Sequence, residues 1–227
     1  VVDKAFLTFD SSARFFDGVD CEVVGNPIRR DLLELAEGFS YEAPAEGEPF
    51  NILVIGGSGG AASLNSDLPA ALVGLEELGA HVHVRHQCGR GRSDELDGRY
   101  DGFHGEVEVT EFIDDMAAAY DWCDLLICRA GASTIAEVLV LGIPAVYVPF
   151  PGAADDHQTK NAREIAEAGG GVTLPDDEIG SPRATRLLAG LIRNPVSLEN
   201  LSSKARSMGR PQAAQRVAES CLKMMGH

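Results

Sequence analysis

The stretch NILVIGGSGGAASLN, residues 51–65, joins a short apolar run to four glycines, one serine and an alanine-rich segment. The β-branched residues within 52–55 are typical of a buried strand, and the residues from 61 onward carry apolar side chains at helical spacing. Glycine permits positive φ and lets another group approach the backbone closely. A helix start adds free N–H groups and a partial positive charge. The stretch therefore predicts a strand, a turn and a helix that together bind an anion, most often a phosphate.

The same turn fits three further interpretations. Gly57, Gly59 and Ala62 fit the G-x-G-x-x-A dinucleotide fingerprint, but the next strand candidate, 81–85, ends without the acidic residue that would hold a ribose. The G-x-S-x-G pattern around Ser58 is that of a hydrolase nucleophile elbow, yet only about 50 residues precede it and none forms an HGGG-like oxyanion run. The third interpretation is a glycine-rich turn that binds no ligand. We favour a nucleotide-phosphate site over all three.

Composition limits the classes of partner. The 227 residues suffice for one substantial core, or for one domain plus a piece of another. The formal charge of −16, from 35 acidic and 19 basic residues, opposes binding to nucleic acid or to an anionic membrane surface. We therefore expect no nucleic-acid partner. The sequence has no apolar run near the roughly 20 residues of a membrane span and no signal segment at its start, which predicts a cytoplasmic protein.

The cysteines and histidines do not predict a metal centre. The five cysteines are scattered, odd in number and without a CxxC pair, and the six histidines do not sit at ligand spacing with them. We expect reduced cytosolic cysteines, with Cys123 and Cys128 packed around a strand.

From residue 50 onward, strand and helix patterns alternate. This alternation predicts right-handed βαβ crossovers and a parallel, Rossmann-like sheet with helices on both faces. Because ligands bind at the carboxyl ends of such strands, the loops after residues 55, 128 and 148 should face one side. The expected strands are 51–55, 81–85, 107–109, 124–128, 144–148 and 171–174, and the expected helices include 61–78, 114–121, 133–141, 157–168, 182–192 and 211–224.

The pattern divides the chain into three parts. Residues 1–35 contain two short strand-like runs, too few to form a core alone, so we expect them to dock on another part of the protein. Residues 36–49 are rich in Glu, Ala and Pro without a period, which predicts a linker or an exposed loop. Residues 50–227 form the predicted Rossmann-like domain with C-terminal helices.

Two strand ends carry residues suited to a sugar nucleotide. In RAGASTIAE, residues 129–137, Thr134 and Glu137 fit a capping box, in which each side chain closes a free N–H group at a helix start. Alternatively, the Glu137 carboxylate accepts hydrogen bonds from a sugar diol. From the residues alone both stay open, with the cap favoured. Phe112 and Ile113, before an expected helix, either flank a flat base or pack in the core.

The second strand end is PFPGAADDHQTKNARE, residues 149–164. Asp155 or Asp156 is a suitable cap for a helix that begins near His157. His157, Gln158 and Asn161 lie on neighbouring turns of that helix, so their polar ends can converge on a polyhydroxyl ligand. A metal site formed by residues 155–157 is disfavoured because adjacent residues seldom ligate one ion.

Taken together, these motifs resemble the C-terminal half of the MurG-type peptidoglycan glycosyltransferases. The match runs in order over most of residues 22–175, and the set is far more specific than any single motif. The resemblance implies a GT-B fold of two Rossmann-like domains and inverting transfer of N-acetylglucosamine from UDP-N-acetylglucosamine to a lipid-linked muramoyl-pentapeptide (lipid I to lipid II). The matching segments are GNPIRRD, ILVIGGSGGAASLN, VTEFIDDMAAAY, CRAGASTIAEVLVLGIPAVYVPFPGAADDHQTKNA and EAGGG.

The resemblance also implies roles for individual residues. Arg29 would approach the nucleotide, Ser58 and its neighbouring N–H groups would meet the diphosphate, and Ile113 would contact uracil through its backbone. Glu137 would bind the ribose hydroxyls even if it also caps the helix, and Gln158, helped by His157, would hold the sugar. The full set of expected substrate-binding residues is Arg29, Gly57, Ser58, Gly59, Ile113, Ala132, Ser133, Thr134, Ile135, Ala136, Glu137, His157, Gln158 and Asn161.

Full members of that family carry a preceding domain with a histidine implicated in catalysis, the acceptor pocket and much of the membrane-contacting surface. Residues 1–30 resemble only the tail of that domain. The resemblance therefore implies a donor-binding half that is inactive alone, needs no cofactor or metal ion, and belongs to an enzyme peripheral on the cytoplasmic face of the cell membrane. Two alternatives stay open: a subunit of a naturally split N-acetylglucosaminyltransferase, and a non-catalytic UDP-sugar-binding module.

Overall fold

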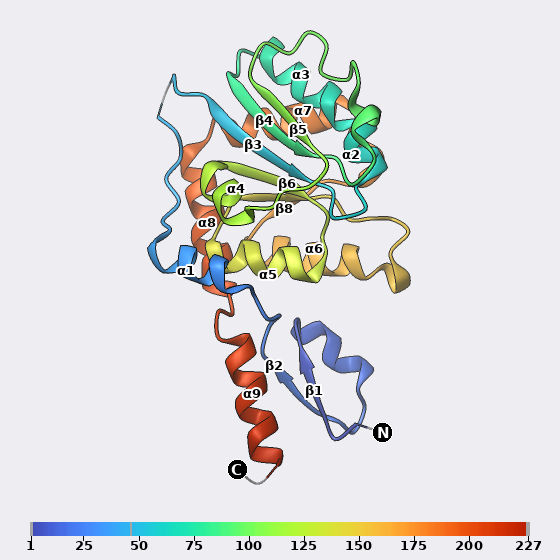
Figure 1. Cartoon of the computed structure of the whole chain (residues 1–227), viewed down its shortest axis with the longest axis vertical. Helices are drawn as coiled ribbons and strands as arrows, with labels where there is room; N and C mark the ends of the chain where they lie inside the picture. The colour runs from blue at the N-terminus through green and yellow to red at the C-terminus, as the bar shows by residue number, and fades with distance from the viewer. Residues whose placement is uncertain (1, 46, 226–227) are drawn as a thin grey trace.

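The fold is built on a six-stranded sheet, shown in Figure 1 by a computed structural model that describes residues 2–45 and 47–225. The first residue, residue 46 inside the predicted linker, and the last two residues lie outside the described part. All neighbouring strands are parallel, in the order β5-β4-β3-β6-β7-β8. The predicted parallel sheet is therefore confirmed. Its strands are β3 (Phe50–Ile55), β4 (Val82–Gln87), β5 (Val107–Thr110), β6 (Leu125–Cys128), β7 (Ala145–Tyr147) and β8 (Val172–Thr173).

The register brings the ends of the central strands together. Ile55, the last residue of β3, is opposite Gln87 of β4 and Cys128 of β6, and Cys128 is opposite Tyr147 of β7. The loops after these strands therefore lie along one edge of the sheet, as predicted. From β3, the strands β4 and β5 continue toward one edge of the sheet, whereas β6, β7 and β8 continue from the other side of β3 toward the opposite edge. The strand order therefore switches between β3 and β6, and ligands bind at this position in open α/β sheets.

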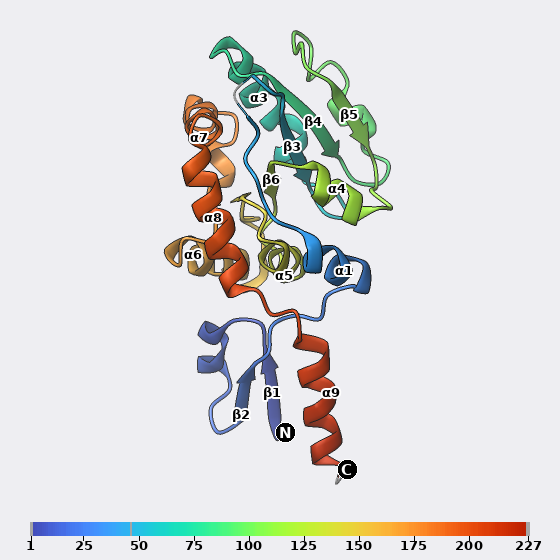
Figure 2. The ribbon, with the colours of Figure 1, turned by 90° about the vertical axis from the view of Figure 1, so that its left-hand side faces the viewer.

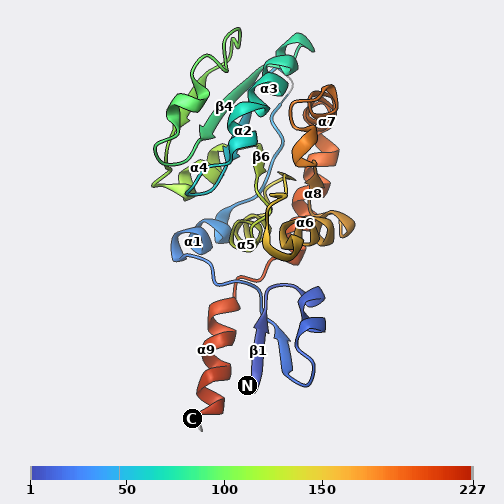
Figure 3. The ribbon, with the colours of Figure 1, turned by 90° about the vertical axis from the view of Figure 1, so that its right-hand side faces the viewer.

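Helices cover both faces because the buried strands are apolar on both sides. In β3, Ile52 and Val54 belong to one core cluster, while Leu53 and Ile55 belong to the other. Figure 3 shows α1 and α7 on opposite sides of the sheet. One face is packed by α2 (Ala62–Ser66), α3 (Leu68–Glu77) and α7 (Pro182–Ile192), and the other by α1 (Arg30–Gly38), α4 (Met116–Trp122), α5 (Ala132–Leu141) and α6 (His157–Glu167).

The helix predictions need two corrections. The expected single helix over 61–78 is two helices, α2 and α3, that meet at Asp67. Pro69 causes the break, because it has no N–H to donate to the preceding turn and sits in the first turn of α3. Helix α8 (Pro195–Met208) was not predicted. Asn194 is its N-cap and accepts a hydrogen bond from the Ser197 N–H at 3.0 Å, and an asparagine at this position is a typical sequence signal for a helix start.

Helix α8 holds two other helices in place. The Arg206 guanidinium donates to the carbonyl of Phe39, just after α1, at 2.9 Å, and to that of Leu141, the last residue of α5, at 3.1 Å. A cation at these carbonyl ends also complements the negative pole of each helix. Gly142 ends α5 in the left-handed conformation (φ 74°). These contacts fix the orientation of α5, whose N-terminus faces the ligand edge of the sheet.

The N-terminal residues form a separate small layer. Strands β1 (Lys4–Leu7) and β2 (Asp20–Val23) are the two expected runs and pair in parallel. In Figures 1 and 2 they project away from the main sheet beside α9 (Ala213–Met224), with both termini at the same end. Glu22 of β2 forms ion pairs with Lys4 at 2.9 Å and with Arg216 of α9 at 3.1 Å. Helix α1 runs across the predicted boundary between residues 35 and 36.

Within the described ranges, the search for a helix with the length and apolarity needed to cross a bilayer finds none.

Candidate functional site

The glycine loop after β3 is a tight turn whose shape only glycine permits. Gly57 and Gly60 have φ of 86° and 70°, and the Gly60 N–H donates to the Gly57 carbonyl at 2.9 Å. A Cβ on Gly60 would lie 2.1 Å from the Cys88 carbonyl oxygen, whereas Cβ atoms on Gly57 and Gly59 would meet open space. The loop is therefore pressed against the end of β4 on one side and open on the other.

Two adjoining hollows lie on the open side of this loop. We call them the Glu137 hollow and the Arg129 hollow, and they share Ile55, Gly57 and Thr134. Further residues of the Glu137 hollow are Arg29, Ser58, Gln87, Phe112, Ile113, Asp114, Met116, Tyr120 and Glu137. Further residues of the Arg129 hollow are Gly56, Gly60, Ala61, Ala62, Ser63, Arg92, Arg129, Gly131, Phe150, Gln158 and Asp176.

Glu137 presents a carboxylate to the first hollow. One oxygen, Oε2, accepts a hydrogen bond from the Tyr120 hydroxyl at 2.9 Å, and the other, Oε1, lies 3.9 Å from Arg29 Nε. Burial raises the pKa of the Glu137 carboxyl, while the Tyr120 hydroxyl and the Arg29 charge oppose that rise. With one oxygen engaged by tyrosine, the carboxylate has acceptor capacity left for a hydroxyl-bearing ligand.

The predicted capping box is wrong. Helix α5 begins at Ala132 with Gly131 as its N-cap and without a side-chain cap, so Thr134 and Glu137 both lie inside the helix. Because the helix starts three residues earlier than a cap at Thr134 requires, neither side chain reaches a free N–H group there. Glu137 is thus available as a ligand-binding group, and no side chain of the described residues caps the start of α5.

Arg129 fixes a positive charge at the end of β6. Its guanidinium pairs with Asp176, donates to the Ser63 hydroxyl at 2.8 Å and to the Val148 carbonyl at 3.2 Å, and lies 5.5 Å from the centre of the Phe150 ring. These contacts hold the cation beside the uncapped N-terminus of α5. Sequence analysis did not assign Arg129 a role, although its position directly after a predicted strand was a usable signal.

Seven of the expected substrate-binding residues line the two hollows. Gln158 lines the Arg129 hollow, and its Oε1 accepts a hydrogen bond from the Phe150 N–H at 3.0 Å. Gly59 belongs to the glycine loop itself, and its carbonyl accepts a hydrogen bond from Arg92 Nη1 at 2.9 Å. The residues found in the Glu137 hollow are Arg29, Gly57, Ser58, Ile113, Thr134 and Glu137.

The other expected residues lie elsewhere. Ser133 accepts a hydrogen bond from the Asn26 side chain at 3.1 Å, and Asn161 donates to the Ala130 carbonyl at 3.2 Å. Ile135 and Ala136 face a third hollow, between α5 and the N-terminal strands, and Ala132 packs against the adjoining core. His157 Nδ1 lies 2.7 Å from the Ala154 carbonyl oxygen, outside both hollows. Their predicted roles toward the nucleotide stay predictions.

The loop before α6 is strained. Asp156 occupies the predicted N-cap position, but its side chain makes no capping hydrogen bond. Asp155 and Asp156 have positive φ, 50° and 54°, which is costly for non-glycine residues and is concentrated at functional sites. Across residues 2–45 and 47–225, no group of three or more His, Cys, Asp or Glu side chains is arranged to hold a metal ion.

Gln87 ends β4, where a dinucleotide site would carry its acidic residue. Its Nε2 donates to the carbonyls of Gly57 at 3.0 Å and Glu111 at 2.9 Å, so the amide joins the glycine loop to the loop after β5. Gln87 Oε1 is buried and has no hydrogen-bond partner in the described structure. The hydrolase interpretation of the loop also lacks support. A nucleophilic serine needs an adjacent base, and in the described ranges the Ser58 hydroxyl makes no hydrogen bond to a histidine.

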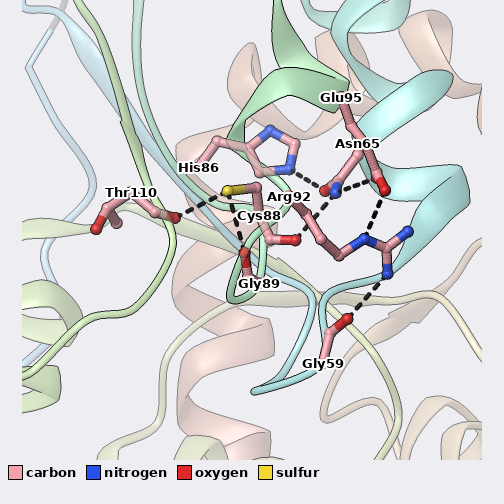
Figure 4. Close-up of polar contacts among 8 residues, drawn as sticks. All are labelled: Gly59, Asn65, His86, Cys88, Gly89, Arg92, Glu95 and Thr110. Carbon is pink, nitrogen blue, oxygen red and sulfur yellow. Dashed lines mark hydrogen bonds and ion pairs between the residues drawn. The ribbon is translucent and has the colours of Figure 1, made fainter.

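A polar network lies behind the glycine loop (Figure 4). His86 is fully buried, and its Nε2 lies 3.2 Å from Asn65 Oδ1. Its other ring nitrogen, Nδ1, lies 2.7 Å from the Tyr100 hydroxyl. Asn65 Nδ2 donates to the Glu95 carboxylate at 2.8 Å, and Glu95 accepts from Arg92 Nε at 2.7 Å. The network therefore runs from the core beneath β4 to the edge of the Arg129 hollow.

Acid is expected to destabilise the fold through His86. Burial lowers the pKa of His86 to about 4, whereas the unfolded chain binds the proton near pH 6.5. Stability is therefore lost as the pH falls from 6.5 toward 4, by about 2 kcal/mol at pH 5 relative to neutral pH. Urea unfolding of wild type and His86→Gln at pH 5 and 7 measures this. Equal pH dependence in both proteins would contradict it.

Comparison with known proteins identifies the family. The sequence model of the glycosyltransferase family 28 C-terminal domain matches residues 51–217. The chain belongs to this family. It is 46% identical over 201 residues to the UDP-N-acetylglucosamine–N-acetylmuramyl-(pentapeptide) pyrophosphoryl-undecaprenol N-acetylglucosamine transferase of Alkalilimnicola ehrlichii, covering 88% of this chain and 56% of that protein. The transferase of the same name from Chromohalobacter salexigens is 42% identical over 222 residues, covering 98% and 60%.

Solved structures agree with this family 28 assignment. The crystal structure of Acinetobacter baumannii MurG superposes with a TM-score of 0.73 at 34% identity, covering 89% of this chain and 57% of that one. A UDP-N-acetylglucosamine 2-epimerase superposes with a TM-score of 0.65 at 17% identity, covering 100% and 58%, which shows a shared fold alone. The chain thus has the fold of one half of a GT-B glycosyltransferase and spans little more than half the length of the curated relatives it matches.

Proposed function

We propose that this chain is the donor-binding half of an inverting transferase that moves N-acetylglucosamine from UDP-N-acetylglucosamine to a lipid-linked muramoyl-pentapeptide. The observation that carries the proposal is the Glu137 carboxylate beside the open side of the glycine loop, with the Arg129 cation in the adjoining hollow. A nucleoside diphosphate needs these features in this order: a diol acceptor, backbone N–H donors and a positive charge. The family and the names of the relatives support the choice of sugar nucleotide.

The two hollows divide the donor between them. In the Glu137 hollow, Phe112 and Ile113 flank the uracil and the Glu137 carboxylate accepts hydrogen bonds from the ribose hydroxyls. The diphosphate lies where the hollows meet, at Gly57 and the first turn of α5. The N-acetylglucosamine unit extends into the Arg129 hollow, where we assign Gln158, one of its lining residues, to hold the sugar.

The chemistry of transfer follows from this placement. As the glycosidic bond breaks, negative charge develops on the departing UDP, and the N–H groups of the loop and of α5 stabilise it together with Arg129. Inversion also needs a general base that removes the proton of the acceptor hydroxyl. We assign that base, the acceptor pocket and the membrane contact to a further N-terminal domain. The isolated chain then binds donor without transferring sugar.

The test is a calorimetric titration with UDP-N-acetylglucosamine and UDP-glucose. We expect the N-acetylated donor to bind more tightly, and we expect transfer to appear only when an N-terminal domain of a relative is supplied in trans. Absence of uridine nucleotide binding would contradict the proposal. Binding without transfer, even with the added domain, would favour a non-catalytic UDP-sugar-binding module instead.

Ser58→Ala is expected to weaken UDP binding only modestly. Its hydroxyl would donate one of several hydrogen bonds to the charged diphosphate, so the loss should lie at the low end for such bonds, about 1.5 kcal/mol, and the affinity should fall roughly 10-fold. The backbone N–H groups of the loop remain in place in this variant. Calorimetry against UDP measures the change. An unchanged affinity would remove Ser58 from the site, and loss of a hydrolytic activity in the variant would support the nucleophile elbow instead.

A further inference from the structure

The orientation of the peptide planes in the glycine loop has to be fixed by groups outside the loop. Because glycine has no Cβ, a Gly-Gly peptide reverses its orientation with little steric resistance. In the peptide that joins Gly59 to Gly60, a reversal would point the Gly59 carbonyl oxygen at the Gly57 carbonyl oxygen, to which the Gly60 N–H donates, and would open the turn. An opened turn would no longer aim the other N–H groups of the loop at a diphosphate.

Arg92 holds this peptide. Its Nη1 donates to the Gly59 carbonyl oxygen at 2.9 Å, while the Gly60 N–H at the other end of the same peptide donates to the Gly57 carbonyl at 2.9 Å. Arg92 comes from the loop after β4, which is far from Gly59 in sequence, and its side chain also lines the Arg129 hollow. Figure 4 shows the guanidinium between the Gly59 carbonyl and Glu95.

Arg92 is in turn fixed by two residues behind it. Glu95 Oε1 accepts from Arg92 Nε at 2.7 Å, and Glu95 Oε2 accepts from Asn65 Nδ2 at 2.8 Å. The hydrogen bond from Arg92, followed by that from Asn65, lowers the pKa of Glu95, so the carboxylate stays charged. A guanidinium held at Nε by a carboxylate has a defined plane, which directs Nη1 at the Gly59 carbonyl.

The buried end of the network fixes the orientation of Asn65. Asn65 Nδ2 donates to the Cys88 carbonyl at 3.0 Å and to Glu95, so its Oδ1 must accept from His86 Nε2–H. His86 Nδ1 then accepts from the Tyr100 hydroxyl. The Cys88 carbonyl held by Asn65 is the same group against which Gly60 packs. The core thus sets the position of both the loop and the arginine that holds it.

We propose that Arg92, held by Glu95 and Asn65, is a positioning residue of the donor site: it fixes the Gly59–Gly60 peptide so that the glycine loop presents N–H groups to the donor diphosphate. The inference rests on the proposed donor function. It predicts that Arg92 matters for ligands that carry the diphosphate and not for the nucleoside alone.

The experiment compares UDP with uridine, by calorimetry for UDP and NMR titration for uridine. Arg92→Gln is expected to lower UDP affinity about 10- to 100-fold, the usual range for losing a charge-assisted hydrogen bond, and to leave uridine affinity unchanged. Arg92→Lys keeps the charge and one donor, so it should recover part of the loss. Arg92→Gln combined with Glu95→Ala should be no worse than Arg92→Gln alone, because both act through one contact.

A matched control separates geometry from net charge. Arg85→Gln removes one positive charge from the same strand-and-loop segment, but Arg85 pairs with Glu108 at 2.8 Å and stacks on Trp122, outside both hollows. It should bind UDP like wild type. An unchanged UDP affinity in Arg92→Gln, an equal loss for uridine, or an equal loss in Arg85→Gln would each overturn the inference. Failure of the wild type to bind UDP would instead refute the donor function itself.

Discussion

Gly60→Ala is expected to have the largest effect of any single substitution in the glycine loop. The new Cβ would lie 2.1 Å from the Cys88 carbonyl oxygen, which is backbone, and alanine would also have to adopt a φ of 70°. The left-handed conformation costs about 1–2 kcal/mol and overpacking about 1–3 kcal/mol. The free energy of unfolding should therefore fall by roughly 2–5 kcal/mol, and UDP affinity should fall more than about 10-fold because the loop must move.

Gly59→Ala is the matched control for that prediction. It adds the same methyl group one residue earlier in the loop, where φ is not left-handed and nothing lies within 4 Å of the new Cβ. Urea unfolding should place Gly59→Ala near wild type and Gly60→Ala well below it. Equal stability of the two variants would show that the loop is not pressed against β4 as described.

Glu137→Ala is expected to have the largest effect on ligand affinity. It removes a charged acceptor from the ribose hydroxyls, and hydrogen bonds to charged groups are worth about 1.5–3 kcal/mol each, so UDP affinity should fall roughly 10- to 150-fold. It also leaves the buried Tyr120 hydroxyl without its partner, which should lower stability by about 1–3 kcal/mol. Calorimetry at a temperature well below the unfolding midpoint separates the two effects.

Two comparisons show whether the lost contact is to the ribose. Wild type should prefer UDP over 2′-deoxy-UDP, and Glu137→Ala should bind both equally. Tyr120→Phe removes the hydroxyl that Glu137 accepts from while keeping the carboxylate, so it should lose stability and keep most of its UDP affinity. If Glu137→Ala kept its UDP affinity while losing stability, Glu137 would be a structural residue only.

Much of the sheet follows from local sequence, because apolar β-branched runs bounded by glycine and polar residues have few alternatives to a buried parallel strand. Each predicted strand agrees with the structure within two residues. The helix errors have local causes as well. Pro69 divides the predicted helix over 61–78, and Asn194 before Pro195 was a start signal for α8 that was not used.

The site was predictable where one segment supplies it and less so where distant segments meet. The glycine loop and Glu137 stand out in the sequence by composition and spacing. Arg92 and Asp176 do not, because their roles depend on contacts with Gly59 and Arg129 that only the folded chain creates. The capping-box error has the same origin, since whether α5 starts at Thr134 depends on the path of residues 129–131 between β6 and the helix.

The measurement that tests the account most directly is a crystal structure of this chain with UDP. We expect the ribose hydroxyls within hydrogen-bond distance of the Glu137 carboxylate, and the diphosphate against the open side of the glycine loop and the first turn of α5. UDP bound elsewhere, such as in the hollow between α5 and the N-terminal strands, would contradict the central claim. So would a ribose turned away from Glu137.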